Sequence, residues 1–220
     1  MDFGLYLITD RRLVDDLPGA VDRALSALPR GAAAVQLREK DLGASALLEL
    51  ALRVGEVCRR RGAPLLINDR IDVALAARAD GVHLAGGSVE VEEARSLGVD
   101  LVGASCHDEA ELDRRGDADF VVCSPIFPSP GKGPAVGIDA LHAAAATGMR
   151  VFALGGVDRT NAAACTWAGA QGVAAIRAWL AAADPAEAVA ALHDLVASGK
   201  AGRFSQGASP PRMAAPRALC

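Results

Sequence analysis

The sequence INDRIDVALAARADGVHL, residues 67–84, spans the end of one short apolar run and the whole of the next. These two runs, PLLI at 64–67 and DGVHL at 80–84, have the length of fully buried β-strands. A longer segment separates them, and short apolar runs continue to alternate with segments of helical period along most of the chain. The alternation predicts an α/β fold in which helices join parallel strands.

Eight strand–helix units in about 195 residues predict a single-domain (β/α)8 TIM barrel, and a doubly wound open sheet is the alternative. We assign the barrel to residues 1–198. Residues 199–220, rich in Ala, Pro, Gly, Ser and Arg, are predicted to form a disordered tail. The predicted strands are 3–8, 33–37, 64–67, 80–84, 100–104, 119–123, 151–154 and 172–176. The predicted helices include 45–61, 90–97, 108–115, 138–147, 161–168 and 185–196.

Composition narrows the class of protein. Hydrophobic residues make up 51% of the chain but aromatic residues only 4%, so the core must be built from Ala, Val, Leu and Ile, which suits buried parallel strands. The net charge of -4, with acidic and basic residues evenly mixed, argues against nucleic-acid binding. Five widely spaced cysteines without a CxxC pair indicate neither a disulfide framework nor a zinc site. Without a secretory signal or an apolar run of about 20 residues, we expect a cytoplasmic protein that does not enter a membrane.

Polar residues follow nearly every predicted strand, where a TIM barrel places its active site. Arg38, Lys40, Lys132 and Arg177 are cationic donors, and a Gly155–Gly156 pair permits close backbone approach to a ligand. Together they predict a site for an anion such as a phosphate group. The strand ends that supply the polar residues read QLREK at 36–40, NDR at 68–70, SCH at 105–107, SPIFPSPGK at 124–132 and GG at 155–156.

Several of these motifs, in this order, resemble those of thiamine phosphate synthases and the related TenI proteins. The resemblance covers about residues 5–180 and rests most on the INDRIDVALAARADGVHL stretch. It implies a TIM barrel that condenses hydroxymethylpyrimidine pyrophosphate with a thiazole phosphate, giving thiamine phosphate and pyrophosphate. Such a reaction needs charge neutralisation and alignment of two substrates, and little acid–base machinery.

The resemblance also implies a role for each matching residue. Arg38, Lys40 and Lys132 would be catalytic and, with Asn68, would contact the pyrophosphate, while Asp69 would bind Mg²⁺. Gln36 and Ser105 would meet the pyrimidine. Ser129 and Gly156 would hold the thiazole phosphate, and Ile176 and Arg177 complete the expected substrate-binding set.

Three positions depart from the pattern of the synthases. Ser88 stands where they have a second magnesium-binding Asp, which leaves Asp69 with the pyrophosphate and Glu90 as candidate ligands and predicts weaker magnesium binding. Gly131 replaces a Thr, and Arg177 replaces a Ser. A guanidinium grips phosphate through two parallel hydrogen bonds, so Arg177 could take over from that serine.

Two other functions stay open. A TenI-type thiazole tautomerase would also have a Ser at position 88, but it needs a His where this chain has Pro125. The losses at Ser88 and Gly131 fit a non-catalytic relative that binds a thiazole or pyrimidine phosphate. His83 is predicted to be a packed, hydrogen-bonded residue. The expected partners are phosphorylated small molecules, and a homodimer is left open.

Overall fold

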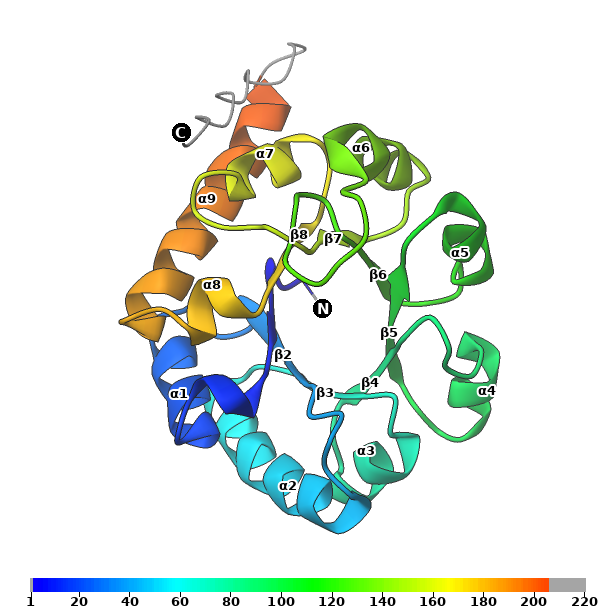
Figure 1. Ribbon diagram of the computed structural model, residues 1–220, viewed down its shortest axis with the longest axis vertical. Helices are drawn as coiled ribbons and strands as arrows, with labels where there is room; N and C mark the ends of the chain where they lie inside the picture. Colours follow the sequence, from blue (N-terminus) through cyan, green and yellow to red (C-terminus); the bar gives the residue numbers. More distant parts are fainter. Residues whose placement is uncertain (1, 206–220) are drawn as a thin grey trace.

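A computed structural model describes residues 2–205, which form a closed barrel (Figure 1). Its eight strands are parallel and pair in chain order, and β8 pairs with β1 to close the sheet. The predicted (β/α)8 barrel is therefore confirmed, and the open-sheet alternative is wrong. The strands are β1 (Leu5–Ile8), β2 (Ala33–Leu37), β3 (Leu65–Asn68), β4 (Gly81–Leu84), β5 (Leu101–Cys106), β6 (Phe120–Cys123), β7 (Val151–Ala153) and β8 (Gly172–Ala175).

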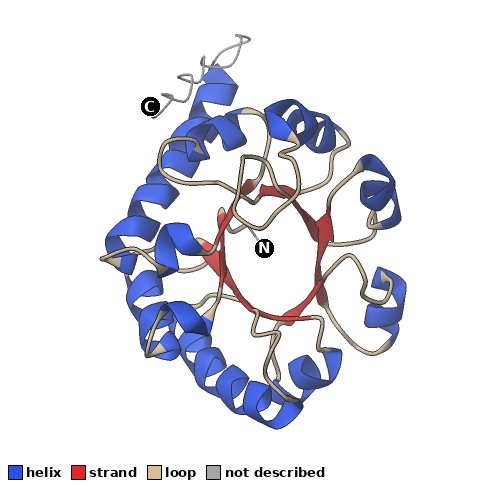
Figure 2. Ribbon diagram, viewed as in Figure 1, coloured by secondary structure: helices blue, strands red, loops and turns tan. Residues whose placement is uncertain are grey.

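The helices surround the strands as an outer ring (Figure 2). Those predicted before residue 170 begin and end within one residue of the observed positions. The helices are η1 (Arg11–Leu13), α1 (Leu17–Ser26), α2 (Ala44–Arg61), α3 (Ile71–Ala77), α4 (Val91–Ser96), α5 (Glu109–Arg114), α6 (Gly137–Ala146), α7 (Ala162–Trp167), α8 (Arg177–Leu180) and α9 (Pro185–Ser205).

The apolar residues form two cores, one on each side of the sheet. Outward-facing Val, Leu and Ala side chains of the strands pack against the helices, as the composition predicts. The interior of the barrel instead contains an aromatic cluster, with the rings of Tyr6 and Phe120 centred 5.1 Å apart and those of Phe120 and Phe152 5.3 Å apart. This cluster fills the interior of the barrel. The carboxyl ends of the strands form the rim that we call the mouth, where TIM barrels bind their ligands.

The predicted tail is wrong in its first part, because α9 continues through Gly199 to Ser205. A Cβ at Gly199 would collide with the Thr166 hydroxyl and the Ala163 carbonyl of α7. Glycine therefore lets α9 lie directly against α7 (Figure 1) and does not end the helix. The rest of the predicted tail, residues 206–220, lies outside the described residues. Within residues 2–205, no helix combines the length and apolarity needed to span a bilayer.

Candidate active site

The mouth of the barrel contains side chains from several strands. Side chains alternate between the inside and the outside along each strand, so the residue two positions after an inward-facing one also faces inward. This alternation brings three of the predicted substrate-binding residues to the same inner surface. They are Gln36, which follows Ala34, Asn68, which follows Leu66, and Ser105, which is in line with Leu101.

The residues after β2 are held by a buried carboxylate that the sequence analysis did not single out. Glu39 is 5% exposed and accepts hydrogen bonds from the Thr9 hydroxyl at 2.6 Å and from the backbone N–H of Arg11. The Thr9 oxygen in turn accepts the backbone N–H of Arg38 at 3.0 Å. Glu39 thus ties the β2 loop to the end of β1 and fixes the backbone that carries Arg38 and Lys40.

Arg38, Lys40 and Lys132 are close enough at the mouth for their positive charges to interact. The pKa of Lys132 is lowered from its usual value, first by burial and then by the positive charges of Arg38 and Lys40. Within residues 2–205, the side chains of these three residues form no ion pair. Cations held together without an ion pair produce a local positive potential that attracts an anion. This positive charge is what the predicted anion site on the β2 and β6 loops requires.

Asp69 lies beside this positive group in a constrained position after β3. Its backbone is left-handed, with φ of 59°, and its carboxylate accepts hydrogen bonds on both oxygens. Asn68 Nδ2 donates to Oδ2 at 2.9 Å, while the Ala85 N–H, at 2.9 Å, and the Ser88 hydroxyl donate to Oδ1. Ser88, the residue that stands in place of the second carboxylate, therefore orients the first one.

The donor set suits a magnesium ion that brings most of its own ligands. Glu90, the other candidate carboxylate, caps α4, and its Oε2 lies 3.2 Å from Arg115 Nη1. Within the described chain, no group of three or more His, Cys, Asp and Glu residues could hold a metal. Magnesium commonly binds one or two carboxylates together with substrate phosphates and water. Asp69 fits that role only in combination with a phosphorylated substrate.

His83 lies inside the barrel beneath the mouth and is neutral. Burial lowers its pKa to about 3, although the nearby charge of Asp69 opposes this shift. Its Nε2 lies 3.0 Å from Ser105 Oγ, which confirms the predicted hydrogen-bonded role. Within residues 2–205, its Nδ1 is buried without a hydrogen-bond partner, and the buried Gln36 Nε2 and Tyr6 hydroxyl have at most each other. Such buried groups are costly to leave unpaired, so this part of the interior is suited to a ligand with polar ring atoms.

The opposite side of the mouth is a loop packed on two glycines. Gly155 and Gly156 follow β7 with φ of 92° and 64°. The loop between β6 and α6 lies over the ends of β7 and β8 (Figure 1), and the Phe127 N–H donates to the Gly155 carbonyl at 2.9 Å. This loop contains Ser129 and Lys132, so it brings both predicted residues toward Gly156.

Ile176 and Arg177 follow β8 on the same side. Ile176 packs partly buried against the inner apolar cluster, and Arg177 is exposed at the first residue of α8. Trp179 fixes this segment, because its fully buried indole N–H donates to the Ile8 and Ala175 carbonyls at the ends of β1 and β8. The structure therefore places Arg177 at the mouth, and within the described residues its side chain has no ion pair.

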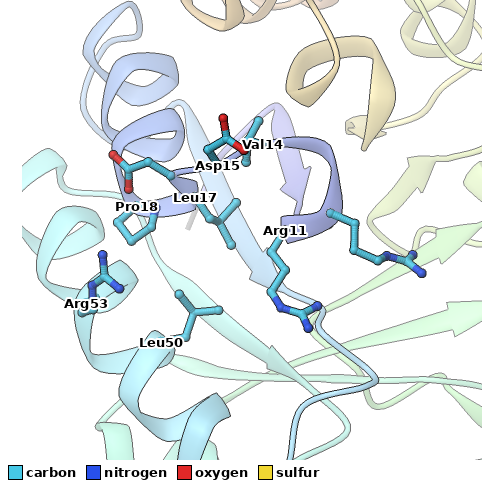
Figure 3. A pocket seen from close by; sticks show the side chains of 9 residues that line it. Arg11, Val14, Asp15, Leu17, Pro18, Leu50 and Arg53 are labelled. Carbon is cyan, nitrogen blue, oxygen red and sulfur yellow. The ribbon is translucent and has the colours of Figure 1, made fainter.

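A separate hollow of about 290 Å³ lies outside the barrel between η1, α1 and α2 (Figure 3). None of the predicted substrate-binding residues lines it. Two of the arginines that line it are already paired, Arg11 with Asp41 and Arg12 with Asp10. This hollow is therefore distinct from the cationic site at the mouth.

Comparison with known proteins agrees with the motifs at the mouth. The family profile described as "Thiamine monophosphate synthase" matches residues 5–179. The chain belongs to this family. The match covers all eight strands and every predicted site residue.

Curated relatives and solved structures extend this likeness over most of the chain. A Geobacter sulfurreducens protein is 46% identical over 206 residues, which are 89% of this chain and 95% of that protein. The thiamine-phosphate synthase of Chloroflexus aurantiacus is 38% identical and is matched over 89% of this chain and 94% of its own length. The solved thiamine phosphate pyrophosphorylase of Pyrococcus furiosus superposes with a TM-score of 0.83 at 30% identity, covering 90% of this chain and 98% of that one.

Proposed function

We propose that this chain is a thiamine phosphate synthase, a transferase that joins hydroxymethylpyrimidine pyrophosphate to a thiazole phosphate. Membership of the family and the names of the relatives support the activity. The observation that carries the proposal is the proximity of Arg38, Lys40 and Lys132 at the mouth of the barrel, with Asp69 at the end of β3, the strand next to β2. A pyrophosphate leaving group requires this kind of charge neutralisation.

The reaction breaks one bond and forms another at the same carbon. The bond between the pyrimidine methylene carbon and the pyrophosphate oxygen breaks, and pyrophosphate leaves with the electron pair. The ring nitrogen of the thiazole phosphate then donates its lone pair to the resulting cation, forming the carbon–nitrogen bond of thiamine phosphate. Neither step requires a base on the protein, so charge stabilisation and alignment of the two substrates are the main requirements.

The mouth offers a separate group of residues for each part of the substrates. Arg38, Lys40, Asn68 and Lys132 bind the pyrophosphate, and Asp69 holds Mg²⁺ together with it. Magnesium, when bound, neutralises charge on the leaving group. Gln36 and Ser105 bind the pyrimidine beside the unpaired polar atoms of the interior. Ser129 and Gly156 bind the thiazole phosphate, with Ile176 and Arg177 next to them.

Product formation from the two purified substrates, with and without Mg²⁺, tests the proposal. We expect thiamine phosphate only when Mg²⁺ is present. Asp69→Asn should lower kcat/KM by more than about 100-fold, because changes around a metal ligand alone commonly cost 10–100-fold. Asp72→Asn is the matched control, since Asp72 is an exposed carboxylate three residues away that pairs with Arg70.

Two other results would contradict the proposal. Isomerisation of a thiazole carboxylate phosphate without condensation would identify a tautomerase. Tight binding of either substrate without any product would identify a non-catalytic relative. The cytoplasmic location and the homodimer remain predictions from the sequence, and gel filtration with light scattering tests the latter.

A further inference from the structure

Arg115 is a buried cation that holds one loop of the mouth from outside the barrel. It lies at the C-terminal end of α5, and its side chain is 4% exposed. Its guanidinium donates to the Val89 carbonyl at 3.0 Å, to Glu90 Oε2 at 3.2 Å and to the Ala85 carbonyl at 3.2 Å. All three acceptors belong to residues 85–90, the loop between β4 and α4. A buried charge is tolerated only with such partners, so this loop and Arg115 fix each other.

The same loop fixes the carboxylate that is expected to meet the metal. Ala85 accepts a hydrogen bond from Arg115 through its carbonyl and donates one to Asp69 through its N–H at 2.9 Å. Ser88, between the residues that Arg115 contacts, donates its hydroxyl to the same Asp69 oxygen. Two of the three hydrogen bonds that the Asp69 carboxylate accepts therefore come from the loop that Arg115 holds.

These contacts leave Asp69 little freedom in how it meets a cation. An ionised carboxylate has about four lone-pair positions, and the three hydrogen bonds use most of them. Without the loop, the carboxylate could rotate about its side-chain bonds and lose the direction in which it faces the mouth. Partners outside the metal's own ligands commonly control affinity in this way.

We propose that Arg115 is a positioning residue for metal–pyrophosphate binding, which it controls by holding residues 85–90 and, through Ala85 and Ser88, the Asp69 carboxylate. The proposal rests on the proposed function for the identity of the substrate. The site has two halves, one for the pyrophosphate and one for the thiazole phosphate, and different loops form them. The proposal predicts that Arg115 affects binding in the pyrophosphate half only.

Arg95, whose side chain is 36% exposed, provides a control with the same kinds of acceptor at the other end of the barrel. It donates to the carbonyls of Asp100 and Asp117 and to the carboxylate of Asp119, so it also has two carbonyl acceptors and one carboxylate acceptor. Those acceptors precede β5 and β6 in the chain and lie away from the mouth. Arg95→Lys therefore measures how metal–pyrophosphate binding responds when a hydrogen-bonded guanidinium is lost away from the mouth.

Binding of Mn²⁺ with inorganic pyrophosphate, followed by the EPR signal of free Mn²⁺, tests the proposal without requiring turnover. Arg115→Lys should weaken binding by at least about tenfold, while Arg95→Lys should match the wild type. Arg115→Lys should also leave the KM for the thiazole phosphate within about threefold of the wild-type value, as expected for an effect confined to one half of the site. If Arg115→Lys does not fold, Ser88→Ala decides in its place, with weaker Mn²⁺–pyrophosphate binding expected.

Unchanged metal binding in the folded variant, or equal losses in both halves of the site, would overturn the proposal. A wild-type protein that binds Mn²⁺–pyrophosphate but forms no thiamine phosphate would refute the proposed function alone, because the binding comparison would still decide the role of Arg115.

Discussion

Replacing Gly156 with alanine adds one methyl group where the β6–α6 loop rests on the end of β7. Gly156 has φ of 64°, which costs a non-glycine residue about 1–2 kcal/mol. Its new Cβ would also lie 2.7 Å from both Phe127 Cβ and the Pro128 carbonyl oxygen. These atoms have little room to yield, and overpacking of this kind costs about 1–3 kcal/mol. We therefore expect Gly156→Ala to lose about 2–5 kcal/mol in the free energy of unfolding.

Gly148→Ala separates the two contributions. Gly148 has φ of 87°, but a Cβ there would have nothing within 4 Å, so only the backbone cost of about 1–2 kcal/mol applies. Urea-induced unfolding measures the difference between the variants, and kcat/KM measures its effect on the site. Displacement of the loop that carries Ser129 and Lys132 should lower kcat/KM at least about tenfold in Gly156→Ala only. Equal stability and equal kcat/KM in the two variants would refute the reasoning.

Two predictions concern pH. Because burial and the charges of Arg38 and Lys40 lower the pKa of Lys132, kcat/KM should fall on the alkaline side at a pH below the ordinary lysine value of 10.5. Lys132→Arg should remove this fall in a pH–rate profile. His83 has a pKa lowered to about 3, so its contribution to stability is complete above its unfolded value of 6.5 and is lost as the pH falls toward 3. In that range the wild type should lose about 1.4 kcal/mol per pH unit more than His83→Gln in urea titrations, and parallel curves would contradict this.

The strands could be predicted closely because each is a short apolar run bounded by polar or glycine residues. The composition after Gly199 predicted a disordered tail, but α9 continues there. Glycine, which usually ends helices, at this position lets α9 lie against α7. For the site, the strand-end residues were found because the fold brings all such ends to one mouth. Arg115 was not found, because only packing distinguishes its side chain, 4% exposed, from that of Arg114, which is 57% exposed.

The distribution of charge at the mouth favours condensation over isomerisation. Isomerisation moves a proton and needs a group that can accept it near neutral pH. His83 is a poor base because its pKa is about 3 and its Nε2 is hydrogen-bonded to Ser105 Oγ. His107 is exposed in the turn before α5, and its Nδ1 lies 3.1 Å from Glu111 Oε2. Pro125 stands where the tautomerases have their histidine. The mouth instead combines cationic side chains with a neutral, partly unpaired polar interior, which is what departure of an anion and capture of the resulting cation require.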